Sequence, residues 1–207
     1  LKTTKEVIER CHLCGVKVYI TMNTILYEDE MEDAYNMAKK VHSYGVDALI
    51  IQDLGFIHLL HHRLPNLVLH ASTQLSISNP YQIKQLKKLG VKRVVLAREC
   101  TKEEIQACVD TGIEVEVFVH GALCICYSGQ CYFSSVHYGR SGNRGMCAQP
   151  CRMKYSLYED GNKVDTHGEY VLSPKDLSLM DEVNTLADMG VCSLKIEGRM
   201  KSAPYVY

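Results

Sequence analysis

Four cysteines between residues 124 and 151 have the type and spacing to hold one inorganic centre. The spacing is Cys124-x6-Cys131-x15-Cys147-x3-Cys151, and a fifth thiol, Cys126, lies between the first two. Thiolates are soft ligands that both iron–sulfur clusters and structural zinc use. The residue types alone therefore favour neither metal. Cys126 competes for one place in the set, although alternation along an extended loop would turn its side chain away from that of Cys124.

The segment that carries these cysteines is positively charged. Residues 117–158 contain no Asp or Glu, whereas Arg140, Arg144, Arg152 and Lys154 lie in the same stretch. Cations stabilise nearby thiolates, and they also attract anionic substrates such as nucleic-acid phosphates. Tyrosines interleave with these cations, and aromatic and arginine side chains together stack an unpaired RNA base. Packing of the tyrosines around the metal centre is equally compatible with the pattern.

The overall composition is that of an ordinary globular enzyme. The chain has 207 residues, of which 46% are hydrophobic, and a formal net charge of -1. We expect one domain spanning residues 1–207, no transmembrane segment, and nucleic-acid contact only through a local basic loop. Half of the ten cysteines lie in one loop. This distribution favours a metal site in a reducing compartment, the cytoplasm, over a disulfide framework.

The rest of the chain repeats one sequence pattern: an amphipathic helix, then a glycine, then a strand rich in β-branched residues. Thr3 or Thr4, Asn79-Pro80 and the pair Thr101 and Glu104 mark helix starts. A further helix is predicted from Ser173-Pro174 to residue 189. The seven predicted strands are 16–21, 46–51, 67–71, 91–96, 113–119, 170–172 and 191–196.

Strands that alternate with helices predict a parallel sheet with right-handed crossovers. The strands are nearly continuous apolar runs, which predicts that both faces of the sheet are covered. We predict a TIM-barrel-like α/β fold with a cysteine-rich insertion at 121–169, after the strand that ends near residue 119. Such a barrel needs eight strands, so its first strand is expected upstream of residue 1, and the open edge beside 16–21 would pair with a second copy. A doubly wound sheet is the alternative.

In a barrel, the reacting groups lie where the strands end. Polar residues follow the apolar runs at these points: Asn23, Gln52, His70, Gln74, Arg98, Glu99, His120, Glu197 and Arg199. His70 and His120 could bind substrate or transfer protons, or they could be structural. Arg98, Arg199 and Lys201 could bind the carboxylates of a small diacid. Alternatively, Arg98 with Glu99 and Glu197 with Arg199 are internal ion pairs.

Several stretches together resemble one family. They are Glu116-x-Phe118-x2-Gly121-Ala122-Leu123-Cys124-x4-Gly129-x-Cys131-x2-Ser134, Arg144-Gly145-x-Cys147-Ala148-x-Pro150-Cys151-Arg152, and Lys195-Ile196-Glu197-Gly198-Arg199-Met200-Lys201-Ser202. The chain resembles peptidase family U32, historically called collagenase-like proteases, over nearly its whole length. Phe133 stands where the family pattern usually has a smaller aliphatic residue. The family's opening strand and first glycine-containing loop have no counterpart in this sequence.

The resemblance implies a barrel-like catalytic domain and a chemistry. Several members are oxygen-independent hydroxylases in which four cysteines bind a 4Fe–4S cluster, a role that falls here on Cys124, Cys131, Cys147 and Cys151. Some hydroxylate a pyrimidine of tRNA or ribosomal RNA, with prephenate as the implied hydroxyl donor. The loop at 142–152 looks most like this RNA-modifying branch. From their types and positions at the strand ends, separately from the resemblance, we predict catalytic roles for His70, His120, Arg98, Glu99, Glu197 and Arg199, and substrate contacts for Gln74, Arg140, Arg144, Arg152, Lys154 and Lys201.

Two other functions remain open at this point. The first is peptide hydrolysis, in which Cys124 and His120 would act together, although neither Gly-x-Ser-x-Gly nor His-Glu-x-x-His occurs. The second is a non-catalytic module, stapled by a metal such as zinc, that docks a partner subunit. A partner subunit could also be required by the hydroxylase.

Overall fold

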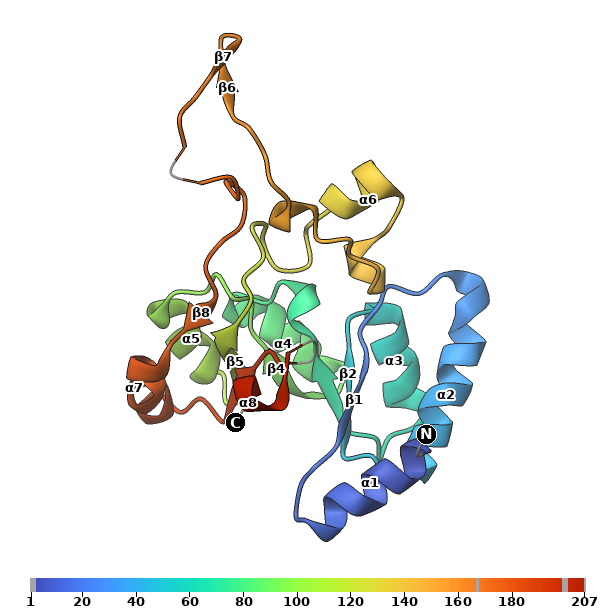
Figure 1. Cartoon of the computed structure of the whole chain (residues 1–207). Coiled ribbons are helices and arrows are strands. Elements are labelled where there is room, and N and C mark those ends of the chain that lie inside the picture. Colours follow the sequence, from blue (N-terminus) through green and yellow to red (C-terminus); the bar gives the residue numbers. More distant parts are fainter. Residues whose placement is uncertain (1–2, 167, 199–200, 207) are drawn as a thin grey trace.

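The computed structural model describes residues 3–166, 168–198 and 201–206. Its main sheet joins β1 (Tyr19–Met22), β2 (Ala48–Ile51), β3 (Leu69–Ala71), β4 (Val91–Val95), β5 (Glu114–Gly121), β8 (Leu177–Ser178) and β9 (Ser193–Ile196). The order is β1-β2-β3-β4-β5-β9, with all these neighbours parallel, and β8 pairs antiparallel with the end of β5. The sheet curves into a half-barrel (Figure 1). The predicted TIM-barrel-like parallel architecture is thus confirmed, with β1 and β9 as its edges in the described part of the chain.

Helices cover the outer face of this sheet and begin where local chemistry predicts. They are α1 (Thr4–Leu13), α2 (Met31–Ser43), α3 (Leu54–Arg63), α4 (Pro80–Lys88), α5 (Lys102–Val109) and α7 (Val183–Asp188), and a short α8 (Ala203–Val206) follows β9. Thr3 with Glu6, and Thr101 with Glu104, form capping boxes, and Asn79 caps α4. Each cap satisfies backbone N–H groups that the first helical turn leaves free. Among the described residues, none of the helices has the length and apolar character needed to cross a membrane.

The hydrophobic core lies between the sheet and these helices. Leu49 and Ile51 of β2 and Val94 of β4 are fully buried there, against Phe56 of α3 and Ile83 of α4. Removing one such side chain from water stabilises the fold by about 1.5–3 kcal/mol. The outer face of the sheet therefore supplies most of the stability and leaves the inner face free for other chemistry.

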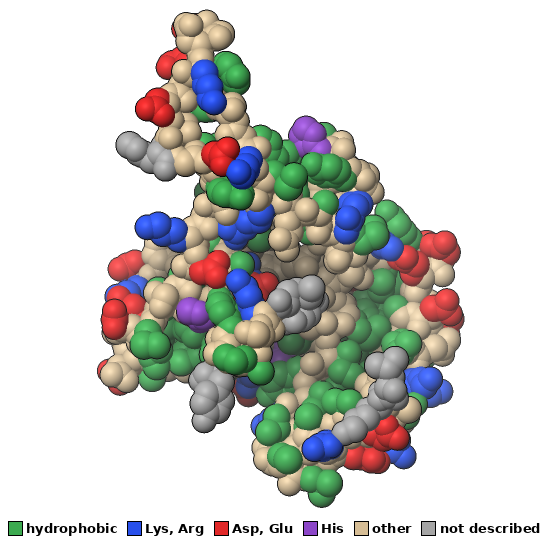
Figure 2. All heavy atoms as spheres, in the orientation of Figure 1, with side chains coloured by type: hydrophobic (Ala, Val, Ile, Leu, Met, Phe, Trp, Pro, Cys, Tyr) green, Lys and Arg blue, Asp and Glu red, His purple; other side chains and the backbone are tan. Residues whose placement is uncertain are grey.

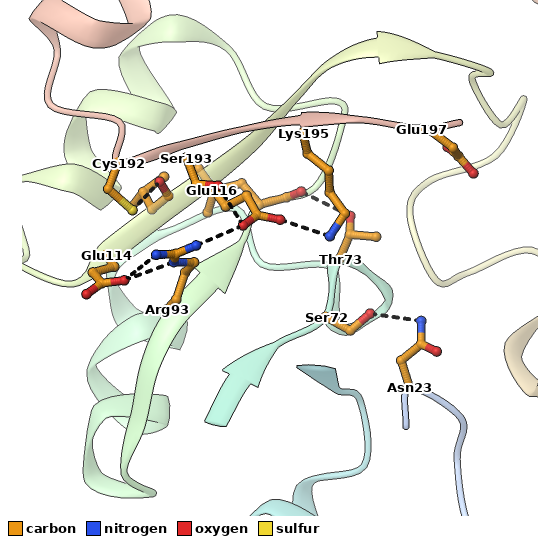
Figure 3. A network of polar contacts seen from close by, with 12 residues as sticks. Asn23, Ser72, Thr73, Arg93, Glu114, Glu116, Cys192, Ser193, Lys195 and Glu197 are labelled. Carbon is orange, nitrogen blue, oxygen red and sulfur yellow. Dashed lines mark hydrogen bonds and ion pairs between the residues drawn. The ribbon is translucent and has the colours of Figure 1, made fainter. Parts of the chain in front are cut away.

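The inner face of β5 carries a buried charged residue among apolar ones. Glu116 is only 5% exposed. Its carboxylate lies 2.8 Å from Lys195 Nζ and 3.3 Å from Arg93 Nη1, and it accepts a hydrogen bond of 2.9 Å from Ser193 (Figure 3). Burial alone would raise the pKa of Glu116, but Lys195, Ser193 and Arg93 outweigh it and hold that pKa below its ordinary value. A buried ion cluster thus joins β4, β5 and β9.

The segment between β5 and α7 differs from the prediction. The predicted strand 170–172 is wrong, because Ser173 N donates to the carbonyl of Tyr170 and closes a turn there. The predicted helix 173–189 is also wrong over most of its length, since α7 begins only at Val183. Residues 177–178 pair with the end of β5 instead, as β8. The insertion itself contains α6 (Phe133–Tyr138) and the hairpin of β6 (Tyr158–Glu159) and β7 (Asn162–Lys163), which projects from the body as an arm (Figure 1).

Replacing the buried carboxylate tests the ion cluster. Glu116→Gln should destabilise the fold by roughly 3–5 kcal/mol, because it leaves Arg93 and Lys195 without their shared buried counter-charge. The free energy of unfolding from denaturant titration measures this change. The matched control is Glu114→Gln, which removes a half-exposed partner of Arg93 and should cost less than about 1 kcal/mol. Equal losses in the two variants would contradict the role assigned to Glu116.

Candidate functional site

A buried serine fixes the cysteine-rich segment to the ends of the strands. Ser128 donates from its backbone N to Glu99 at 2.9 Å and from its hydroxyl to the same carboxylate at 2.8 Å. The backbone N of Arg98 donates to Ser128 Oγ at 3.2 Å, and the hydroxyl of Ser76 donates to the Ser128 carbonyl. Hydrogen bonds to a charged group contribute about 1.5–3 kcal/mol each. Glu99 therefore holds the loop between the first two cysteines, and its predicted catalytic role stays a prediction.

The backbone of the next residue, Gly129, lies so close to the end of β3 that no side chain fits between them. Its φ is +73°, and a Cβ atom at this position would overlap the carbonyl group of Gln74. Gln74 belongs to a short helix, Thr73–Leu75, that directly follows β3. The turn at 128–129 thus docks the cysteine loop against the ends of both β3 and β4, since Arg98 and Glu99 come shortly after β4.

A second contact brings the two halves of the insertion together. The hydroxyl of Ser134, which is buried, accepts a hydrogen bond of 2.8 Å from the backbone N of Ala148. Ser134 lies three residues after Cys131, and Ala148 directly follows Cys147. This bond therefore holds the second and third cysteines of the set near each other.

Arg152 makes the third contact, and it closes the loop on itself. Its guanidinium donates to the carbonyl of Leu123 at 2.6 Å, to the Ser173 hydroxyl at 2.6 Å and to the Pro174 carbonyl at 2.7 Å. Leu123 directly precedes the first cysteine, and Arg152 directly follows the fourth. The side chain is thus engaged within the chain, so its predicted contact with substrate phosphate stays a prediction.

The first thiol lies among charges and other thiols. Burial by the surrounding chain raises the pKa of Cys124; Arg98 opposes this rise, while Glu197, Cys151 and Cys131 reinforce it. The Nη1 atom of Arg98 is 3.9 Å from the sulfur of Cys124. A second thiolate beside Cys124 would therefore make this thiol harder to ionise, whereas Arg98 would make it easier.

The fourth thiol has similar surroundings. Burial raises the pKa of Cys151; Arg152 opposes the rise, whereas Cys147 and Cys131 reinforce it. The bond between Ser134 and Ala148 and the contact of Arg152 with Leu123 bring together the stretches of chain that carry the four predicted ligands. Among the described residues, no group of three or more His, Cys, Asp or Glu side chains is already arranged around one metal ion. The rival Cys126 has its sulfur 3.5 Å from the Gln130 carbonyl. The ligand set remains a prediction.

Arg98 reaches the first cysteine of the loop from the end of β4. It forms an ion pair with Glu197, which follows β9, and its guanidinium lies 4.0 Å from the centre of the Phe118 ring. The predicted ion pair of Arg98 with Glu99 is wrong, because Arg98 pairs with Glu197 and Glu99 binds Ser128 instead. The predicted pair of Glu197 with Arg199 involves a residue outside the described part of the chain. His120 ends β5, and its ring lies 5.2 Å from the Tyr205 ring.

His70 lies deeper in the half-barrel than the other predicted residues. It is 3% exposed and packs edge-on against Tyr19. Burial lowers the pKa of His70 to about 4; Arg93 adds to this effect, and Glu116 and Glu114 oppose it. The imidazole is therefore neutral near pH 7, which suits a hydrogen-bonding role better than proton donation.

The predicted basic residues of the insertion are engaged within the chain, two of them by acids. Arg144 pairs with Glu30 at 2.5 Å, donates to the carbonyl of Ile25 at 2.5 Å and covers the Tyr27 ring. It therefore ties the insertion to the loop after β1. Arg140 bonds backbone of its own segment. Lysines, arginines and acids intersperse over the visible face (Figure 2).

The remaining predicted cations lie farther along the chain. Lys154 at the base of the arm pairs with Glu169 at 2.5 Å, and Lys201 lies 3.5 Å from Asp176. Arg199 lies outside the described residues. The roles of these cations in binding RNA or a diacid stay predictions.

Sequence reasoning missed the residues that position the loop and fill the half-barrel. Ser128 is a small polar residue in a serine-rich loop, and no sequence pattern distinguishes it. Ser134 ends the family-like stretch that contains Cys131, but that pattern assigns it no role. Glu116 had a signal, since charged and apolar residues alternate from 114 to 117, which is the period of a strand with one polar face. Arg93 and Lys195 are the partners that this alternation implies.

Two glycines with the same backbone conformation test the docked turn. Gly129 and Gly145 both have a φ of +73°, but only Gly129 faces another segment within 4 Å. Alanine at either site costs about 1–2 kcal/mol for the left-handed conformation. Gly129→Ala should cost at least about 2 kcal/mol more, because the added methyl group forces the turn away from Gln74. Thermal unfolding and the rate of limited proteolysis between residues 124 and 151 measure the difference, and equal behaviour of the two variants would contradict docking.

The neutral histidine predicts a pH dependence of stability. The pKa of His70 is about 4 in the fold, and the ordinary value is 6.5. The unfolded chain therefore binds the proton first, so stability is complete above pH 6.5 and falls as the pH drops from 6.5 to 4. At about 1.4 kcal/mol per pKa unit, this loss approaches roughly 3 kcal/mol. Denaturant titrations across this range should show a shallower slope for His70→Gln and an unchanged slope for His137→Gln, which replaces an exposed histidine; a slope unaffected by His70→Gln would contradict the burial effect.

Comparison with known proteins identifies the family. The 23S rRNA 5-hydroxycytidine synthase of Escherichia coli K12 is 43% identical over 207 residues, covering 100% of this chain and 31% of that protein. A tRNA hydroxylation protein P1 of Bacillus subtilis 168 is 40% identical, covering 97% of this chain and 49% of the relative. A collagenase of Porphyromonas gingivalis W83 is 32% identical, covering 99% and 53%. This chain thus spans between about a third and a half of these relatives. The model of peptidase family U32 matches residues 1–207, and the chain belongs to that family.

Proposed function

We propose that this chain is the catalytic domain of an RNA hydroxylase, which adds a hydroxyl group to a pyrimidine of tRNA or ribosomal RNA without using oxygen. The observation that carries the proposal is the docking of the loop that contains the four cysteines against the polar ends of β3 and β4. Two of the similar proteins are named for RNA hydroxylation. We place the reaction in the cytoplasm, where these RNAs are found.

We further propose a 4Fe–4S cluster on Cys124, Cys131, Cys147 and Cys151. The donor set suits the group, since all four donors are thiols and iron–sulfur clusters are held by thiolates. The cluster would supply electron transfer and a site for polarising an oxygen atom. Arg98 would then contribute a positive charge and an N–H beside the Cys124 sulfur. Such neighbouring donors tune the properties of a metal centre.

The hydroxyl donor in this proposal is prephenate or a similar small diacid. Binding two carboxylates requires cations that can exchange partners. Arg98, paired with Glu197, and Lys201, near Asp176, are the described cations closest to the strand ends that could do so. The hydroxyl donor would thus bind at the end of the half-barrel where β5 and β9 stop. RNA phosphates would contact Arg140 and Lys154 on the insertion.

Peptide hydrolysis is less well supported by the site. A cysteine nucleophile needs a base and a lowered pKa. The described contact of the Cys124 sulfur is with Arg98, and burial raises the pKa of this thiol. One similar protein is named a collagenase, so hydrolysis remains an outcome that the experiment below must detect.

The test uses the full-length protein purified without oxygen. We expect iron and sulfide in equal amounts and visible absorbance, both lost in Cys131→Ser and retained in the matched control Cys126→Ser. Mass spectrometry of nucleosides from cells that depend on this protein should show a hydroxylated pyrimidine that also disappears with Cys131→Ser.

Two other outcomes would contradict this proposal. Stoichiometric zinc without iron, in a protein that leaves RNA unmodified, would indicate the metal-stapled docking module. Cleavage of a collagen-derived peptide that is abolished by Cys124→Ala would indicate a peptidase.

A further inference from the structure

Three buried polar atoms at the inner face of the half-barrel lack a partner among the described residues. They are Oε1 of Gln52, Nδ1 of His70 and Oε1 of Gln74. Gln52 is 6% exposed and His70 is 3% exposed. A buried polar atom without a hydrogen bond costs about 1–3 kcal/mol, so such atoms are rare unless a ligand completes them.

The two glutamines are neighbours at the ends of adjacent strands. Gln52 directly follows β2, and its Nε2 donates to the backbone carbonyl of Gln74 at 3.5 Å. Ser72 at the end of β3 accepts from the backbone N of Gln74 at 3.2 Å and from the Asn23 amide at 3.5 Å. Figure 3 shows Asn23 and Ser72 facing each other below the strand ends. The same Gln74 carbonyl lies under Gly129. The glutamine pair is therefore directly beneath the turn between the first two cysteines.

The free atoms of this pair are hydrogen-bond acceptors. A backbone carbonyl can only accept, so the bond to Gln74 fixes the Gln52 amide with its oxygen free. The cations deeper in the half-barrel, Arg93 and Lys195, are shared by Glu116. A carboxylate ligand here would face two oxygens and no uncommitted charge from these groups. The position instead suits a neutral ligand that presents N–H groups.

A pyrimidine edge offers such groups, and the two pyrimidines differ there. The exocyclic amine of cytosine carries two N–H donors on one atom, whereas uracil has a single N–H between two carbonyl oxygens. Unpartnered acceptor oxygens on Gln52 and on its neighbour Gln74 match the donors of a cytosine amine and would repel the uracil carbonyls. Sites built on hydrogen bonds to a substrate reject analogues that leave those groups unpaired.

We propose that Gln52 and Gln74 bind the exocyclic amine of a cytosine turned out of the RNA into the half-barrel, and that they select cytidine over uridine. This assignment rests on the proposed function in taking an RNA pyrimidine as substrate. It places the base at the ends of β2 and β3, beneath the cysteine loop. The ends of β5 and β9 are then left for the small diacid that we propose as hydroxyl donor.

The experiment compares cytidine and uridine 5′-monophosphate as ligands of the full-length protein, by titration calorimetry or ligand-observed NMR. Cytidine monophosphate should bind about tenfold more tightly. Gln52→Met keeps the side-chain volume and removes the acceptor, so the preference should fall to within about twofold. Its thermal midpoint should change little, because removal of the unsatisfied buried oxygen offsets the loss of the 3.5 Å bond from Gln52 Nε2 to the Gln74 carbonyl. Gln85→Met, at an exposed position of α4, should change neither property.

Several results would overturn the assignment. They are equal binding of the two nucleotides, or a Gln52→Met protein that melts earlier and keeps the preference, which would make Gln52 a purely structural residue. Hydroxyuridine as the RNA product would also overturn it, while leaving the hydroxylase proposal intact. Unmodified RNA together with a cytidine preference that depends on Gln52 would uphold the pocket and overturn the hydroxylase.

Discussion

The contact between Ser128 and Glu99 is the constraint on which the site depends. One carboxylate accepts both the backbone and the hydroxyl hydrogen of a buried serine, and this fixes a loop that has little secondary structure. Since β4 ends just before Glu99, the rigid sheet determines where the loop lies. The contacts of Ser134 and Arg152 then fold the remaining cysteines back onto the first. A flexible insertion thus acquires a defined position over the strand ends.

The sheet supports this site by using its two faces differently. Its outer face is apolar and packs on the helices, as a parallel sheet requires. Its inner face carries Glu116, Arg93, Lys195 and His70, whose charges are balanced within the face or removed by burial. TIM barrels usually fill this space with branched apolar residues. A neutral but polar interior can orient a ligand by hydrogen bonds without adding net charge beside the thiols.

Short-range sequence patterns predicted most of the helices and strands of this protein. The arrangement of the site depends on contacts between residues far apart in the sequence, which such patterns do not reveal. Capping residues such as Thr101 and Glu104 act within one helical turn, so the sequence reveals them. The 170–172 strand was wrong because Arg152, about twenty residues away, holds the chain at Ser173 and Pro174 in an irregular path. Arg144 looked like a free cation because its partner, Glu30, is 114 positions away. The cysteine spacing was informative because no ordinary loop needs four thiols.

The central claim is that the docked loop gathers four thiols around one centre at the polar mouth of the half-barrel. Anomalous diffraction at the iron absorption edge, from crystals of the full-length protein grown without oxygen, tests it most directly. The account predicts one strong iron peak bounded by the sulfurs of Cys124, Cys131, Cys147 and Cys151, with Arg98 beside it. An iron peak elsewhere, or these sulfurs dispersed in an ordered loop with Ser128 away from Glu99, would contradict it.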